Sequence, residues 1–137
     1  MTIKLFQNQV CRNHWKAINR LGHLAEETLP AFHVHDQVSF KGSKAWKPEY
    51  FAHYAHVSNI EVDDLEVAFS VHNALGAGLF EQSLHEGREV VHNFNPAHSM
   101  SVGDIVEKDG EHFIVDGCGF EKVQVKEFVS FYKRAHA

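Results

Sequence analysis

The sequence predicts one α+β domain spanning residues 1–137, with a mostly antiparallel sheet packed on one face by two or three helices. Asp109-Gly110 separates two extended segments and is a strong hairpin signal, because a type I′ turn needs positive φ at both central residues. Apolar residues recur at helical spacing near residues 9–28, 64–74 and 124–134. With further strand patterns upstream, we expect four to six strands.

The N-terminal part predicts a short strand over residues 1–6 and then a helix over 9–28. Four apolar residues recur at helical spacing in this helix: Ile18, Leu21, Ala25 and Leu29. Pro30 is expected to stop it, because the residue before a proline disfavours the α region.

Two strands are expected next, with a loop between them. Residues 32–40 alternate between apolar and polar side chains, which predicts a half-buried strand with His33 and His35 on its wet face. Residues 42–48 are expected to form a loop in which Trp46 anchors onto the core. The second strand region is expected over residues 50–62, and its pattern is most convincing over 54–60.

A helix is predicted over residues 64–74, with Asp63 as its N-cap and Glu66 completing a capping box. Gly76 or Gly78 can supply the positive φ at its end. Residues 79–96 show no clear period and contain one candidate strand at 89–94.

The C-terminal part predicts a hairpin of residues 103–107 and 112–116, followed by a bend at 117–120. A last helix is expected over 124–134, from an apolar stripe of four residues: Val125, Phe128, Val129 and Tyr132.

Composition limits the classes of function. The net charge of −5 does not favour direct nucleic-acid binding, which depends on basic surface. The longest apolar runs are too short for a membrane-spanning helix, and the N-terminal residues lack the apolar core of a secretory signal. Cys11 and Cys118 are expected to be reduced thiols. We therefore expect a protein of the cytoplasm with no membrane partner.

A polar motif follows the undecided region. It reads Ser-Met-Ser-Val-Gly-Asp-Ile-Val from Ser99, and its distinctive positions continue into the hairpin: Ser99, Ser101, Gly103, Asp104, Asp109, Gly110, Asp116, Gly119 and Phe120. With these residues, the span 54–123 resembles a small family of phage and mobile-element proteins grouped with YodL-like domains. Residues 1–50 match nothing in that family. The resemblance implies a mobile-element origin and a compact strand–helix–hairpin unit, and it transfers no catalytic residue.

The motif also has a purely structural interpretation. The Asp104 carboxylate and the hydroxyls of Ser99 and Ser101 can cap nearby backbone N–H groups in a turn. A binding role for these three side chains is the alternative. His98, a serine and Asp104 are the residue types of a catalytic triad, but residues so close in an extended segment cannot easily converge.

Histidines are the main candidate metal ligands, and Asp36 or Asp116 could add a carboxylate. His33 and His35 would share one face of the expected strand, and His53 and His56 could add further ligands. The sequence contains no His-Glu-x-x-His or Cys-x-x-Cys pattern, so no metal and no other cofactor is the main expectation.

Three functions remain open. The first is a non-enzymatic phage- or plasmid-encoded protein that binds a host or phage protein in the host cytoplasm and inhibits a defence complex of the CRISPR or restriction type. The second is a small enzyme with a histidine-bound metal, and the third is an accessory protein of virion assembly. The acidic balance suits a basic partner and favours the first.

Overall fold

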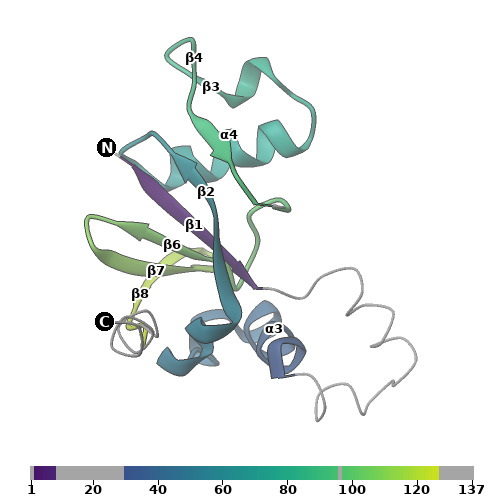
Figure 1. The fold of residues 1–137 in the computed structure, drawn as a ribbon, viewed down its shortest axis with the longest axis vertical. Coiled ribbons are helices and arrows are strands. Elements are labelled where there is room, and N and C mark those ends of the chain that lie inside the picture. Colours follow the sequence, from purple (N-terminus) through teal and green to yellow (C-terminus); the bar gives the residue numbers. More distant parts are fainter. Residues whose placement is uncertain (1, 9–29, 96, 127–137) are drawn as a thin grey trace, which may run out of the picture.

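The computed structural model describes residues 2–8, 30–95 and 97–126. Six antiparallel strands form one sheet, in the order β5-β2-β1-β6-β7-β8 (Figure 1). Their bounds are β1 Ile3–Asn8, β2 Tyr54–Ile60, β5 Val91–Asn93, β6 Ile105–Lys108, β7 Glu111–Asp116 and β8 Gly119–Val123. The predicted α+β class and antiparallel sheet are confirmed.

The first strand in the sequence lies in the middle of the sheet. β1 pairs with β2 on one side and with β6 on the other. The sheet therefore needs residues outside the span 54–123, because without β1 its two halves would have no common neighbour.

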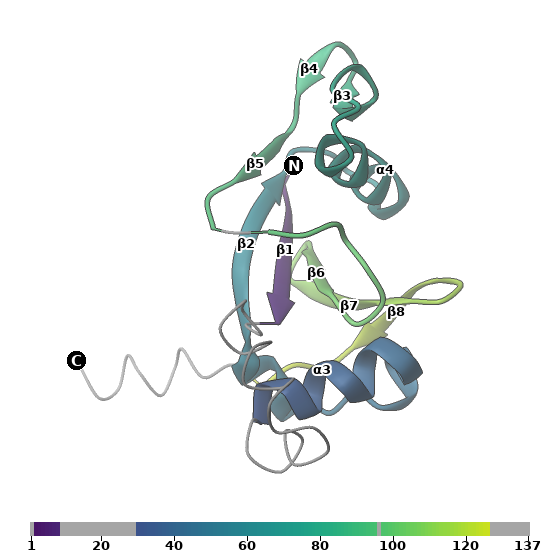
Figure 2. The ribbon, with the colours of Figure 1, turned by 90° about the vertical axis from the view of Figure 1, so that its right-hand side faces the viewer.

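Helices cover both faces of the sheet, not one face as expected. α4 (Leu65–Gly76) packs on the face that carries Leu5 and Val106, and the apolar side chains there form the first core. α3 (Pro30–Lys41) packs on the other face, where Val38 meets Ile105 and Ile114 in the second core. Figures 1 and 2 show α4 and α3 at opposite ends of the molecule. Neighbouring residues such as Ile105 and Val106 point to opposite faces, so the central strands β1, β6 and β7 contribute to both cores.

The strand predicted over residues 32–40 is wrong, because these residues form the helix α3. Pro30 is its first residue, a position where the missing N–H of proline costs nothing. Of the apolar residues that alternate in this segment, Val34 and Val38 are buried, Phe32 is half-buried and Phe40 is 83 % exposed. Val34 and Val38 are four residues apart, and this spacing places two side chains on one face of a strand or of a helix. The alternating pattern was therefore misread as a strand.

Two 3-10 helices follow α3, at Gly42–Lys44 (η2) and Pro48–His53 (η3). Trp46 lies between them and packs against the second core, as predicted. Its indole Nε1 donates a hydrogen bond to the carbonyl of Gln124 at 2.8 Å. The loop is therefore tied to the chain that leaves β8.

α4 begins one residue later than predicted. Its N-cap is Asp64, whose side chain accepts a hydrogen bond from the Val67 amide at 3.0 Å, and Asp63 is not the cap. The helix ends at Gly76, and Gly78 just beyond it has a φ of 78°. The prediction of a positive φ at one of these two glycines is confirmed.

The predicted hairpin is confirmed. Asp109 and Gly110 have φ values of 55° and 78° and join β6 to β7. The bend expected at 117–120 is confirmed in part: residues 117 and 118 form a turn, and residues 119 and 120 begin another strand, β8, which pairs with β7 in a second hairpin. Cys118 lies in the turn between them, exposed and with a free thiol.

The undecided region forms an apical lobe, which we define as residues 77–90. It contains η4 (Glu81–Ser83) and a small hairpin of β3 (Leu84–His85) and β4 (Arg88–Glu89). Figure 1 shows this lobe projecting beyond the main sheet at the end that carries α4. The strand predicted at 89–94 is correct in part, since β5 covers 91–93.

Two of the predicted helices lie wholly or mostly in segments that the structure does not describe. The helix expected at 9–28 lies outside the described residues, as does Cys11. Of the helix expected at 124–134, residues 124–126 are not helical, and residues 127–134 lie outside the described residues. No helix in the described part of the chain combines the length and apolar character needed to cross a bilayer.

Candidate functional site

A buried glutamine connects the polar motif to the centre of the sheet. Gln7 on β1 is 1 % exposed. Its side-chain Nε2 donates to the carbonyl of His98 at 2.9 Å and to Asp104 Oδ2 at 3.0 Å. Its Oε1 accepts from the His98 amide at 3.1 Å. Gln7 therefore holds both ends of the segment 98–104 against β1.

Asp104 closes a tight turn at the end of that segment. Its Oδ2 accepts from the Ser101 amide at 3.0 Å, while its own amide donates to the Ser101 carbonyl at 3.0 Å. Burial raises the pKa of the Asp104 carboxyl to about 6, and the nearby His98 imidazole and the bonds from Ser101 and Gln7 limit the rise. At pH 7 the buried group is therefore still mostly ionised.

A cavity of about 240 Å³ lies beside Asp104. The segment 101–104 forms one wall, and the opposite walls come from the end of β1, α3 and the start of β2: Asn8, His35, Val38, Ser39 and Tyr54. The Tyr54 hydroxyl donates to the Gly103 carbonyl at 2.5 Å. Burial and the charge of Asp104 both raise the pKa of Tyr54, so this phenol stays protonated.

The half-buried imidazole of His35 also lines the cavity. Burial lowers the pKa of His35, the charge of His98 lowers it further, and Asp36 opposes both. His35 is therefore a neutral imidazole at pH 7.

Gly103 sets the closeness of this loop to α3. Its φ is 97°, and a Cβ at this position would lie 2.7 Å from Val38 Cγ2. Only glycine fits both the backbone angle and the space, so this position of the motif shapes the cavity wall.

The other motif residues lie elsewhere and have structural roles. Asp109 and Gly110 form the hairpin turn, and Phe120 packs against the first core. Asp116 accepts from the Ser43 hydroxyl at 2.5 Å, which lowers the pKa of this carboxyl. Gly119 begins β8 with a φ of 127°. The motif therefore divides into a cavity-forming part, from Ser101 to Asp104, and a turn-forming part.

No triad assembles from His98 and its neighbours. The His98 ring Nδ1 lies 2.7 Å from the Ser99 carbonyl, and Ser99 is exposed. Among residues 2–8, 30–95 and 97–126, no hydrogen bond joins the His98 ring to a serine hydroxyl. The expectation that these residues cannot converge on triad geometry agrees with this arrangement.

The candidate metal ligands are not brought together as expected. His33 and His35 lie two residues apart on a helix, so their side chains point about 200° apart around its axis. His53 ends η3, and the His56 ring bonds Asn59 Oδ1 at 2.7 Å on β2. Within the described ranges no three His, Cys, Asp or Glu side chains are grouped so that they could hold a metal ion.

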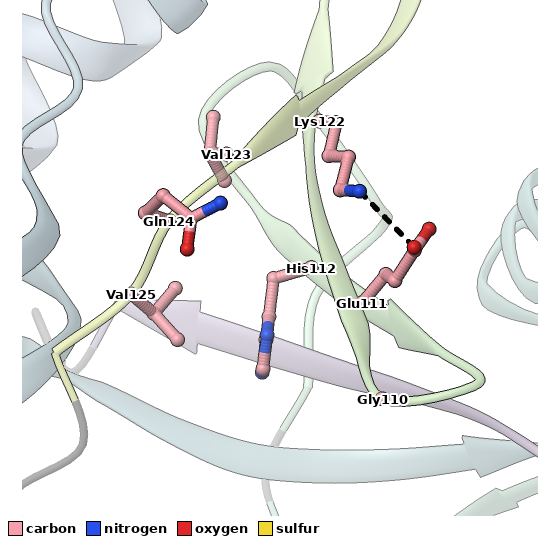
Figure 3. A pocket seen from close by; sticks show the side chains of 7 residues that line it. All are labelled: Gly110, Glu111, His112, Lys122, Val123, Gln124 and Val125. Carbon is pink, nitrogen blue, oxygen red and sulfur yellow. Dashed lines mark hydrogen bonds and ion pairs between the residues drawn. The ribbon is translucent and has the colours of Figure 1, made fainter.

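A second pocket, of about 350 Å³, opens where the chain leaves β8 (Figure 3). Figure 3 shows the His112 ring between the Lys122–Glu111 ion pair on one side and residues 123–125 on the other. The buried Nε2 of His112 makes no hydrogen bond within the described chain, although Glu107 Oε2 lies 3.4 Å away. Phe51 contacts the ring edge to face, with centroids 5.5 Å apart. His112 is thus enclosed by the second core.

Large apolar side chains are exposed outside both pockets. Leu79 and Phe80 on the apical lobe are each 51 % exposed, and Phe94 after β5 is 53 % exposed. Phe40, at the end of α3, is the fourth such residue among those described.

Sequence reasoning found Asp104 and Gly103 but missed Gln7, Tyr54 and His35 as their neighbours. One signal was available at Gln7, because it continues the buried alternation of Ile3 and Leu5 with a polar residue. A polar side chain in a buried row needs partners, and the motif supplies them.

No protein-family model, no curated protein and no solved structure matches this chain. The resemblance to phage and mobile-element proteins therefore stays an expectation.

Proposed function

We propose that the chain is a non-enzymatic binding protein that recognises a partner protein through the apical lobe. The observation that carries this proposal is the exposure of Leu79 and Phe80, half of each side chain, on a part of the molecule that projects from the sheet. Adjacent exposed apolar side chains on a projection are typical of contact sites, while single ones are common on any surface.

The surroundings of the two apolar residues suggest the chemistry of the partner. Glu81, Glu86 and Glu89 are exposed on the lobe, and Arg88 is its one exposed Lys or Arg residue. An acidic rim around an apolar centre suits a partner with an apolar pocket bordered by lysines or arginines.

The energy available from the lobe is sufficient for a measurable effect. Burying a fully exposed Leu or Phe side chain contributes about 2 kcal/mol, so the exposed half of each contributes about 1 kcal/mol. Removing both should weaken binding by roughly thirty-fold, since 1.4 kcal/mol corresponds to a factor of ten.

The proposed setting is the host cell of a phage or plasmid, where the partner belongs to a defence complex of the CRISPR or restriction type. Its support is the resemblance of the span 54–123 and the acidic balance of the chain. The apical lobe and the Asp104 cavity would fit other settings equally well. The defence setting therefore needs a test of its own.

The test is phage plating on a host strain with an active defence complex that expresses the chain. We expect plating to recover with the natural chain, to fall with the double variant Leu79→Ser and Phe80→Ser, and to remain with Phe40→Ser as the matched control. Plating that stays low with the natural chain in strains carrying either class of defence would refute the defence setting. Recovery of the chain in purified virions would favour the assembly role instead.

A further inference from the structure

Two hydroxyls that line the cavity beside Asp104, those of Tyr54 and Ser39, offer a ligand acceptor lone pairs, because their hydrogens are already used within the protein. The Tyr54 hydroxyl donates to the Gly103 carbonyl, and the Ser39 hydroxyl donates to the His35 carbonyl at 2.6 Å. Each hydroxyl has one hydrogen and two lone pairs. Because both hydrogens are used, these two groups can only accept hydrogen bonds from a ligand.

The backbone of the motif is used in the same way. The Gly103 amide donates to the Val115 carbonyl at 2.9 Å, and the Asp104 amide donates to the Ser101 carbonyl. These two N–H groups are therefore not available to a ligand in the cavity.

Asp104 adds a negative charge without a matching cation. Both of its side-chain hydrogen bonds, from Gln7 and Ser101, go to Oδ2, and Oδ1 accepts none from the described residues. Across the described ranges no lysine or arginine forms an ion pair with Asp104. A buried charge is usually paired, so the site lacks a cation.

From this geometry we propose that the Asp104 cavity binds the head group of an organic cation with N–H donors, a guanidinium or a primary ammonium. The donors of the head group meet Asp104 Oδ1 and the lone pairs of Tyr54 and Ser39. The side chains of Val38 and Val102 line the same cavity and suit an alkyl stem. A volume of about 240 Å³ is below the usual range for a cofactor or drug-sized ligand, which restricts the occupant to a small head group. The site is separate from the apical lobe and does not depend on the proposed function.

The probes are methylguanidinium and n-propylammonium, with tetramethylammonium at equal ionic strength as a cation without N–H donors. Binding is followed by amide chemical shifts of residues 101–104 and by titration calorimetry. We expect saturable shifts with both N–H cations, at a Kd of about 10 mM or tighter, and none with tetramethylammonium.

Variants separate the proposed contacts from general charge effects. Asp104→Asn should abolish binding, and Tyr54→Phe should weaken it about five-fold, the effect of one hydrogen bond. Glu81→Gln on the lobe also removes one negative charge and should leave the affinity unchanged.

Lowering the pH should also weaken binding. Asp104 loses its charge as the pH falls through its pKa of about 6, and protonation of the neighbouring His35 imidazole acts in the same direction, while the Tyr54 phenol stays protonated in this range. Binding by the natural chain should therefore weaken as the pH falls through about 6.

A capped Gly-Arg-Gly tripeptide distinguishes two sources of the head group. Binding at least as tight as that of methylguanidinium indicates a side chain of another protein, and exclusion of the tripeptide indicates a free small molecule. Shifts that are equal for tetramethylammonium, or equal in Asp104→Asn and the natural chain, or absent for both N–H cations, overturn the proposal.

Discussion

Replacing Asp104 by asparagine should stabilise the protein at neutral pH, although Asp104 is buried and hydrogen-bonded. The pKa of its carboxyl is raised to about 6 from an ordinary value of 3.8. A difference of one pKa unit corresponds to about 1.4 kcal/mol, so ionisation costs the folded state about 3 kcal/mol at pH 7. Asparagine keeps an oxygen that can accept from Gln7 and Ser101 and carries no charge.

The pH dependence of this effect has a definite sign. Because the folded pKa of Asp104 lies above the unfolded one, the folded state binds the extra proton, and stability is lost as the pH rises from about 4 through 6. The variant cannot ionise at this position. The difference in unfolding free energy, variant minus natural chain, should therefore increase by about 2 kcal/mol between pH 4 and pH 7, because part of the unfolded chain is already ionised at pH 4.

The assay is urea unfolding of both proteins at several values of pH between 4 and 7. Subtracting the two curves cancels the contribution of other titrating groups to the pH dependence of stability. One such group is the buried His72, whose pKa is lowered and whose effect on stability has the opposite sign. A difference that stays constant across this range, or that decreases as the pH rises, would refute the account of Asp104.

Two further substitutions test the neighbours of Asp104. Gly103→Ala should destabilise the fold by about 3 kcal/mol in urea unfolding, because the new Cβ strains a backbone with φ of 97° and meets Val38; a loss below about 1 kcal/mol contradicts this packing. Gln7→Ala should cost about 3 kcal/mol and speed amide exchange at His98, because three hydrogen bonds are lost; unchanged exchange would show that Gln7 does not hold this segment.

Local patterns predicted the elements that depend on local chemistry. The Asp109-Gly110 turn follows from its turn residues, and the structure has it. The strand region expected over 50–62 is correct in its central part, since β2 covers Tyr54–Ile60, while residues 50–53 belong to η3. α3 was mistaken for a strand because Val34 and Val38, four residues apart, satisfy both periods. What separates the two structures is the exposure of Phe40, which depends on tertiary packing and not on its neighbours in sequence.

The candidate site was predictable only in part, for a related reason. Gly103 and Asp104 stand out as turn residues in the sequence. Their essential partner, Gln7, is 97 residues from Asp104, and no local pattern joins positions so distant. The position of β1 between β2 and β6 creates the contact, and that order of strands is a property of the whole sheet.

The measurement that tests the central claim most directly is quantitative copurification from the proposed host with three forms of the chain. The claim is that recognition uses the apical lobe. The natural chain and Phe40→Ser should retain the same partner in equal amounts, while Leu79→Ser with Phe80→Ser should lose most of it and remain folded by circular dichroism. Equal retention by the folded lobe variant, or loss with Phe40→Ser alone, would contradict the claim.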